Sequence, residues 1–317
     1  MSSEVPGGQP PCSGKRRGWT VVLVLALVLA PDRARAQTNT PDATGAPKVN
    51  WALDGSITGA AVLGTVLVAL ISVDTSTRWR TQLLPFDRRL EGRASAVAAK
   101  ASDVLLAVDV AMPLGILLGQ SGMNEAYGKR ALLYGETVMV GLFLNGITKY
   151  LVGRPRPYTY NDDPRAQNYA KSQGIDSHLS FYSGHASTTF AASVAGAYLF
   201  AQGTTDRRAR AAVWSFELAL AGATAILRTR AGKHFYSDVL VGALVGAALG
   251  FAVPRLHGGP RVSLSTAEWV VVGSAPVAGA VVAQLVPVKL DFMLSRQAVM
   301  LPWATGSGGG LMLARTF

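Results

Sequence analysis

Three short polar segments contain residue types that can bind an anion and attack it. In the last of them, Arg228 precedes His234 and Asp238, which are four residues apart. On a helix this spacing places both side chains on one face, so the carboxylate can accept a hydrogen bond from the imidazole. Such a bond selects one tautomer and leaves a lone pair on the other ring nitrogen, as a nucleophile requires. A helical His–Asp pair on a protein surface has the same spacing, and the pattern alone does not decide between them.

A second segment, Ser183-Gly184-His185, stands just before an apolar stretch. A small hydroxyl residue and a glycine at a helix N-terminus expose backbone N–H groups beside the positive end of the helix dipole, which favours anion binding. His185 can hold or release a proton near neutral pH. A helix cap followed by a surface histidine has the same sequence, so the tripeptide alone is a weak signal.

The first segment along the chain carries two cations seven residues apart, Lys149 and Arg156. Gly153, Pro155 and Pro157 end the preceding helix and restrict the backbone that follows. The two cations are therefore presented by a stiffened loop. Positive residues at a helix C-terminus also stabilise the helix dipole, which is the alternative reading of this segment.

Apolar stretches rich in Ala, Gly, Leu and Val must position these segments, and each segment lies at the end of one. Their pattern predicts six helices. The stretches are residues 55–73, 101–119, 131–152, 186–201, 211–227 and 238–253. Several are short for lone membrane spans, but their small residues let neighbouring helices approach closely, which predicts a packed membrane bundle. A soluble all-α domain is the alternative.

Composition favours the membrane class. Charged residues make up 15% of the 317 residues, below the roughly 25% usual in soluble domains, and mean hydropathy is +0.26. The net charge of +11 fits a nucleic acid, an anionic membrane surface or a phosphorylated substrate equally well. The single cysteine, Cys12, excludes a disulfide framework and a thiolate metal cluster.

The chain begins with the pattern of an export signal. Basic residues at 15–17 precede the apolar run 19–30, and Ala34-Arg35-Ala36 supplies small residues at a cleavage site. The run is short against the ~20 residues that span a bilayer, so we expect residues 1–36 to be removed. Residues 37–54 are polar and read as a linker.

The helical domain is expected over residues 55–256, followed by a C-terminal tail at 257–317. Alternation over 288–292 and the glycines of 306–310 predict β character in the tail. The segment 269–288 is apolar enough for a further span, but Pro276 and Pro287 argue against a regular helix there.

The order Lys-x6-Arg-Pro, Ser-Gly-His and Arg-x5-His-x3-Asp resembles the three-part signature of the type 2 phosphatidic acid phosphatase (PAP2) family. That family shares its site with bacterial acid phosphatases and vanadate haloperoxidases. The resemblance covers about residues 55–256. Two departures occur: Tyr182 stands where the family usually has Pro, and Leu227 where it usually has Ser. Neither replaces a reacting group, so they bear on substrate fit.

The resemblance implies an all-α, six-helix membrane bundle that removes phosphate from a membrane lipid phosphate or pyrophosphate. His234 would attack phosphorus and form a phosphohistidine, Asp238 would orient it, and His185 would protonate the leaving oxygen. The implied phosphate-binding residues are Lys149, Arg156, Ser183, Gly184 and Arg228. The chemistry implies no metal and no cofactor. The implied partners are the lipid substrate and the bilayer, and not a nucleic acid.

Other functions for the same residues stay open at this point. A vanadate haloperoxidase would hold vanadate in the pocket with His234 as its ligand, and a soluble periplasmic acid phosphatase would use the same groups. A lipid-binding or transport bundle would not need the histidine pair.

The expected location is a bacterial inner membrane, crossed several times, with the site facing the periplasm as in relatives that act on exported lipids. A cleaved signal conflicts with this, because six spans then place the loop 154–183 inside. The six Lys and Arg residues of 74–100 also favour the inside. The site lies on the periplasmic side again if the stretch 101–119, which contains Asp103, Asp109 and Pro113, does not span the membrane.

Overall fold

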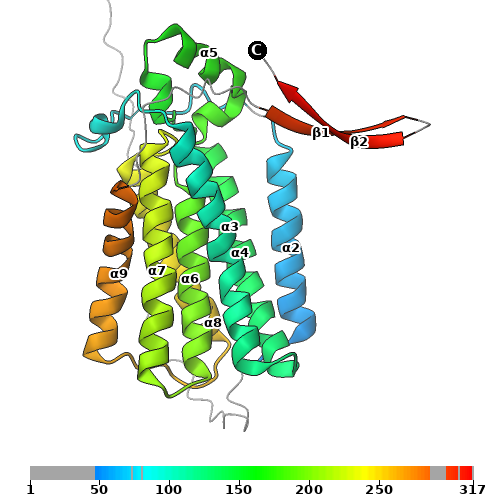
Figure 1. Ribbon diagram of the computed structural model, residues 1–317. Helices are drawn as coiled ribbons and strands as arrows, with labels where there is room; N and C mark the ends of the chain where they lie inside the picture. Colours follow the sequence, from blue (N-terminus) through cyan, green and yellow to red (C-terminus); the bar gives the residue numbers. More distant parts are fainter. Residues whose placement is uncertain (1–46, 73, 80, 286–297, 306–307, 316–317) are drawn as a thin grey trace, which may run out of the picture. The chain divides into compact units, whose positions relative to one another are not determined.

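The computed structural model describes residues 47–72, 74–79, 81–285, 298–305 and 308–315. The chain divides into two units, residues 1–40 and 41–317, and all described residues belong to the second. This unit is a bundle of long helices (Figure 1). The long helices are α2 (Trp51–Ala69), α3 (Ala96–Ser121), α4 (Glu125–Val152), α6 (Gly184–Gln202), α7 (Arg207–Arg230), α8 (Tyr236–Leu256) and α9 (Thr266–Gln284). The short ones are η1 (Asp87–Leu90), η2 (Pro157–Tyr160), α5 (Pro164–Ser172) and η3 (Gly174–His178).

The predicted all-α class is confirmed, and each of the six apolar stretches forms a long helix. The sequence leaves 269–288 undecided between a further span and an irregular segment, and the structure shows that α9 runs as one helix through Pro276. Pro287 lies outside the described residues. Two glycines explain how α9 packs: a Cβ on Gly222 of α7 would lie 2.0 Å from the carbonyl oxygen of Pro276, and one on Gly279 would lie 1.8 Å from that of Ala219. This backbone-to-backbone contact holds α9 in place despite the proline.

Six of the long helices, α2, α3, α4, α7, α8 and α9, are long and apolar enough to cross a membrane. The exception among the seven long helices of the described residues is α6, which is the most enclosed of them. Of its 19 residues, 15 are buried, including Ser187, Thr189 and Ser193. The protein is therefore a multi-pass membrane bundle with a polar-containing helix at its centre.

A row of glycines joins α8 to this central helix. A Cβ on Gly242, Gly246 or Gly250 would lie within 2.1 to 2.7 Å of a backbone carbonyl oxygen of α6 or of its cap, Ser183. No side chain fits in that space, so the two helices touch along their backbones. Because the second polar segment begins α6 and the third leads into α8, this contact brings the two segments together.

Hydrogen bonds between helix ends show how the helices alternate in direction. The N–H of Ser183 donates to the carbonyl of Asp238 at 3.0 Å. The end that carries these two residues and Lys149 is called the motif end. At the opposite end, the N–H of Lys48 donates to the carbonyl of His257 at 2.9 Å, and the side chain of Gln120 donates to the carbonyl of Phe200 at 2.9 Å. Longer connections, 153–183 among them, lie at the motif end.

Helix α3 is continuous through Pro113 and spans the bundle. The carboxylates of Asp103 and Asp109 do not prevent α3 from spanning the bundle. Asp109 is buried and accepts a hydrogen bond from the Ser193 hydroxyl of α6 at 2.9 Å. Asp103 lies near the motif end with an exposed side chain. The condition under which 101–119 fails to span is therefore not supported, because α3 is long and apolar enough to cross a membrane.

The C-terminal tail contains the β character expected from its sequence. Strands β1 (Ala298–Thr305) and β2 (Gly308–Arg315) pair antiparallel, with Ala298 opposite Arg315 and Thr305 opposite Gly308. The alternating residues 288–292 lie outside the described residues.

Candidate active site

Lys149 and Arg156 are positioned by the end of α4. Gly153 caps the helix in the left-handed region with φ +62°, and a Cβ there would lie 2.6 Å from the carbonyl oxygen of Thr75. Glycine alone fits this turn. Lys149 lies in the last helical turn, and within the described part of the chain its Nζ has no hydrogen-bond or ion-pair partner. Arg156 is buried, and its guanidinium donates to the carboxylate of Asp176 at 2.6 Å and to the carbonyl of Lys233 at 3.2 Å.

The second segment forms the N-terminus of α6, as the sequence predicts. Ser183 caps the helix, and its hydroxyl accepts from the N–H of Ala186 at 3.3 Å. A Cβ on Gly184 would lie 2.8 Å from Oδ1 of Asn145 and 3.6 Å from Nζ of Lys149. The first cation therefore lies beside the free N–H groups that begin α6, which together form a cradle for an anion.

The third segment turns between α7 and α8. Arg228 is in the last turn of α7, and Gly232 has φ +69° with a Cβ position 1.7 Å from the carbonyl oxygen of Arg93. Only glycine allows this turn, which directs His234 into the site. His234 precedes α8, so its spacing to Asp238 is not a helical i, i+4 relation. The side chain of His234 is 1% exposed.

The predicted hydrogen bond from His234 to Asp238 is replaced by a different one. Nδ1 of His234 lies 2.7 Å from the carbonyl oxygen of Ser180 and 3.9 Å from Oδ2 of Asp238. A carbonyl oxygen only accepts, so Nδ1 carries the proton and Nε2 carries the lone pair. The tautomer that a nucleophile needs is thus fixed by a backbone group.

Asp238 has three other partners, which explains its distance from the imidazole. Its Oδ2 accepts from the hydroxyl of Ser180 at 2.6 Å and from the N–H of Phe235 at 2.8 Å, which caps α8. Its Oδ1 accepts from Arg154 at 2.5 Å. Arg154, which lies just before Arg156 in the first segment, also pairs with the buried Asp87 at 2.9 Å. Asp238 is therefore the centre of a buried ionic network that holds the Ser180 and His234 segments together.

A second carboxylate, outside the three polar segments, links two predicted site residues. Oδ1 of Asp103 on α3 lies 2.8 Å from Nε2 of His185 and 3.0 Å from Nη1 of Arg228. Arg228 also donates to the hydroxyl of Ser102 at 3.0 Å. Asp103 therefore fixes both the histidine of the second segment and the arginine of the third.

The site is strongly positive around its buried histidine. Burial, together with the charges of Arg156, Arg228 and Lys149, lowers the pKa of His234 well below its ordinary value. Burial and the charge of Arg156 likewise lower the pKa of Lys233 to about 8. The structure brings together all eight residues predicted for the site. They are Lys149, Arg156, Ser183, Gly184, His185, Arg228, His234 and Asp238. A neutral imidazole among cations suits nucleophilic attack on an anionic group.

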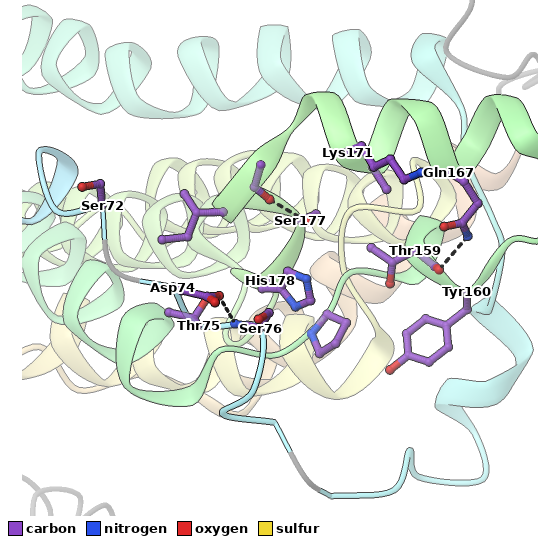
Figure 2. A pocket seen from close by; sticks show the side chains of 14 residues that line it. Ser72, Asp74, Thr75, Ser76, Thr159, Tyr160, Gln167, Lys171, Ser177 and His178 are labelled. Carbon is purple, nitrogen blue, oxygen red and sulfur yellow. Dashed lines mark hydrogen bonds between the residues drawn. The ribbon is translucent and has the colours of Figure 1, made fainter.

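A pocket of about 730 Å³ lies beside this site (Figure 2). The segment from α5 to η3 forms one wall, with Gln167 and His178, and the loop after α2 forms another, with Asp74 and Ser76. Pro155, between the two arginines of the first segment, also lines it. None of the eight predicted residues does, so the pocket adjoins the cationic site without containing it.

Comparison with known proteins gives one match. Residues 130–260 match the family model described as the PAP2 superfamily. No curated protein and no solved structure matches the chain. The matched region includes all three polar segments, whereas Asp87 and Asp103 lie before it.

Proposed function

We propose that this protein removes phosphate from a membrane lipid phosphate or pyrophosphate, starting from the match of residues 130–260 to the PAP2 superfamily model, which indicates phosphatase activity. The observation that carries the proposal is the state of His234. Its Nδ1–H is held by the Ser180 carbonyl at 2.7 Å, so the lone pair of Nε2 is free to attack among three cations. Phosphoryl transfer needs mainly positioning and neutralisation of negative charge, and the side chains around His234 supply both.

In the proposed first step, Nε2 of His234 attacks phosphorus while the bond from phosphorus to the leaving oxygen breaks. His185 gives a proton to that oxygen, which leaves as an alcohol or a phosphate. The product on the enzyme is a phosphohistidine. Its imidazolium keeps the Nδ1–H bond to Ser180, and the Asp238 carboxylate 3.9 Å away stabilises the positive charge.

In the second step, a water molecule attacks the phosphohistidine. His185 takes a proton from the water, the P–N bond breaks, and its electron pair returns to Nε2. Inorganic phosphate leaves and the enzyme is restored. In both steps Lys149, Arg156 and Arg228 would bind the non-bridging oxygens, with the hydroxyl of Ser183 and the N–H of Gly184.

The bundle supports a lipid as the carrier of the phosphate. The cationic cradle lies at the ends of apolar helices, and these helices expose large apolar side chains along their length, such as Leu67 of α2 and Leu244 of α8. A substrate with its headgroup at the membrane surface and its chains among lipids would reach the cradle without leaving the bilayer.

Phosphate release by the purified full chain in detergent tests this proposal. The panel contains lipid phosphates, lipid pyrophosphates and a soluble phosphomonoester, with EDTA present. We expect release that favours a lipid, lost in His234→Ala and kept in His178→Ala, a histidine outside the cradle. Trapping of phosphate on the wild-type chain by acid quench, absent in His234→Ala, would identify the intermediate. No release from any substrate, with halide oxidation once vanadate is added, would instead make this a haloperoxidase.

We further propose that the motif end faces the periplasm of a bacterial inner membrane. Residues 47–50 lead into α2 at the opposite end, so this orientation places them inside and is incompatible with export of residue 37 by a cleaved signal. In a Cys12→Ser background, Ser172→Cys reports the motif end and Thr205→Cys the opposite end. An impermeant thiol reagent on intact cells should label Ser172→Cys alone. Labelling of Thr205→Cys alone would reverse the orientation and support the cleaved signal.

A further inference from the structure

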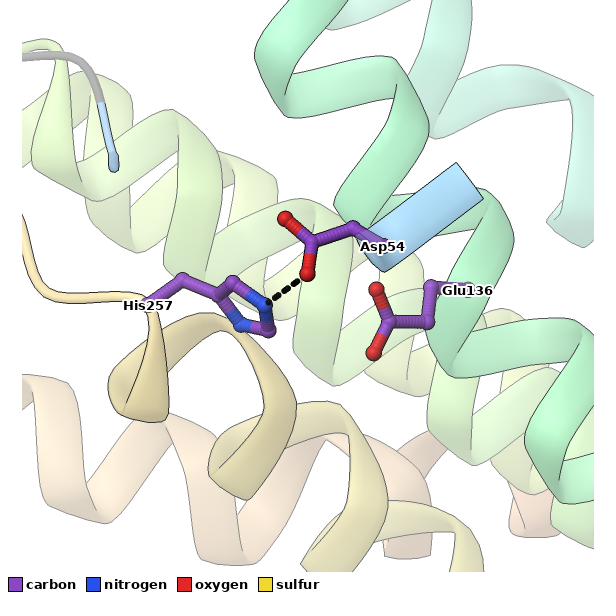
Figure 3. A group of neighbouring side chains, drawn as sticks. All are labelled: Asp54, Glu136 and His257. Atoms are coloured by element: carbon purple, nitrogen blue, oxygen red, sulfur yellow. Dashed lines mark hydrogen bonds and ion pairs between the residues drawn. The ribbon is translucent and has the colours of Figure 1, made fainter. Parts of the chain in front are cut away.

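A group of three metal-ligating side chains (Figure 3) lies at the end of the bundle opposite the cationic cradle. Asp54 is in the first turn of α2, Glu136 is on α4, and His257 caps the C-terminus of α8. One ligand atom from each lies within 4.8 Å of the other two. Glu136 precedes Lys149 by 13 residues on the same helix, which separates the cluster from the cradle by about 20 Å.

The hydrogen bonds of His257 leave a lone pair directed into this group. Its Nδ1 lies 2.8 Å from the carbonyl oxygen of Val253, so Nδ1 carries the proton. In the neutral ring Nε2 is then an acceptor, and it lies 3.3 Å from Oδ1 of Asp54, which is also an acceptor. Two acceptors facing each other need a proton or a cation between them. Figure 3 shows both carboxylates and the imidazole directed toward one another.

Glu136 distinguishes a metal ion from a simple proton. It is 5% exposed, and its Oε2 is buried without a hydrogen-bond partner in the described part of the chain. A proton on Nε2 of His257 would satisfy Asp54 but leave Glu136 unpaired. No described lysine or arginine forms an ion pair with either carboxylate. A divalent cation would satisfy all three groups at once and balance the two negative charges.

We infer that Asp54, Glu136 and His257 bind a divalent transition-metal ion, with Zn²⁺ as the best match. One imidazole nitrogen and two carboxylate oxygens are ligands that zinc accepts, and a water molecule would complete the coordination. The side chain of His257 is 18% exposed, which gives the ion a route in. The second hydrogen bond of His257, to Val253, orients its ring as such bonds do in metal sites.

The ion would anchor α2, the most weakly buried of the long helices. Asp54 and Ala61 are its only buried residues. A metal bound by α2, α4 and the end of α8 would hold the first helix of the bundle to the rest. The role is structural and does not rest on the proposed function.

The test measures metal in the full chain, purified in detergent with a tag that lacks histidine. The chain is stripped with EDTA, moved to chelator-free buffer, incubated with Zn²⁺ and passed through a sizing column before metal analysis. We expect about one zinc per chain, with a rise in Tm on the order of 5 °C. Glu136→Gln and His257→Ala should lose both. Glu125→Gln, on the same helix, and His178→Ala should keep both.

Two further measurements distinguish zinc bound at this site from zinc bound at the cradle, and loss of a ligand from misfolding of a variant. His234→Ala must keep the ion, since loss there would place zinc at the cradle and overturn the inference. Co²⁺ added to the stripped wild-type chain should give visible d–d absorption that Zn²⁺ displaces, a readout that needs no variant. If the wild-type chain binds no ion, or if Glu136→Gln binds as much as the wild type, the inference is wrong and a proton on His257 holds the group.

Discussion

Nδ1 of His234 lies 2.7 Å from the carbonyl oxygen of Ser180, whereas the nearest carboxylate oxygen of Asp238 lies 3.9 Å away. The backbone therefore selects the tautomer, and the aspartate acts on the histidine through charge and through the network around it. This division of roles leads to predictions that differ from those of a His–Asp hydrogen bond.

Asp238→Asn should lower kcat less than the loss of a carboxylate does in an enzyme where that carboxylate fixes the histidine tautomer. Where such a carboxylate fixes the tautomer, its removal lowers kcat about 10⁴-fold. Because the Ser180 carbonyl keeps Nδ1 protonated, we expect a loss of about 10²-fold, against complete loss in His234→Ala. Steady-state turnover of the preferred substrate measures both variants. A loss of kcat in Asp238→Asn as large as that in His234→Ala would show that Asp238, and not the Ser180 carbonyl, fixes the tautomer of His234.

Arg154→Met should act mainly on stability. The protein that remains folded should lose less of its turnover. The guanidinium pairs with Asp87 and Asp238 in the interior, and its removal leaves two buried carboxylates without a cation. Breaking a buried ion pair costs about 3–5 kcal/mol. Thermal unfolding in detergent measures the effect. The control is Arg165→Met, whose pair with Asp163 lies at the surface, and this variant should keep an unfolding temperature close to that of the wild type.

The acid limb of the pH–rate profile should lie below the ordinary pKa of histidine, about 6.5. Burial and the nearby cations lower the pKa of His234, so the attacking neutral form persists as the pH falls. Arg156→Gln removes one of these charges, which makes protonation easier and should move the acid limb to higher pH. The profile of kcat/KM, which reports the free enzyme, measures this shift. An acid limb at the same pH in both proteins would argue that another group sets it.

Asp103→Asn should affect poor leaving groups more than good ones. Asp103 positions His185 and Arg228, and a proton from His185 matters most when the leaving oxygen is basic. We expect a loss of kcat about 10-fold greater with a lipid phosphate than with a nitrophenyl phosphate. The control is Asp163→Asn, outside the site. Equal losses with both substrates would reduce Asp103 to a structural role.

The three motifs could be predicted from sequence because each sits where an apolar stretch ends, and because Gly153 and Gly232 mark the turns that present them. The partners of the motifs could not. Asp87 and Asp103 are distant from them in sequence, and Ser180 acts partly through its backbone, which no residue pattern reveals.

Two sequence rules failed for identifiable reasons. The four-residue spacing of His234 and Asp238 implied a shared helix face, but α8 begins after the histidine. Pro276 argued against a helix, but the backbone contacts made by Gly222 and Gly279 hold α9 against α7.

The glycine row of α8 bears on how substitution data for this protein should be read. Gly242, Gly246 and Gly250 have no room for even a methyl group, so a saturation screen for growth or turnover would score them as intolerant as His234. Intolerance at these positions arises from steric exclusion between two backbones and says nothing about chemistry. A screen that also measures the amount of folded protein would separate the two classes, because the glycine variants would be lost from the membrane while the histidine variants accumulate there inactive.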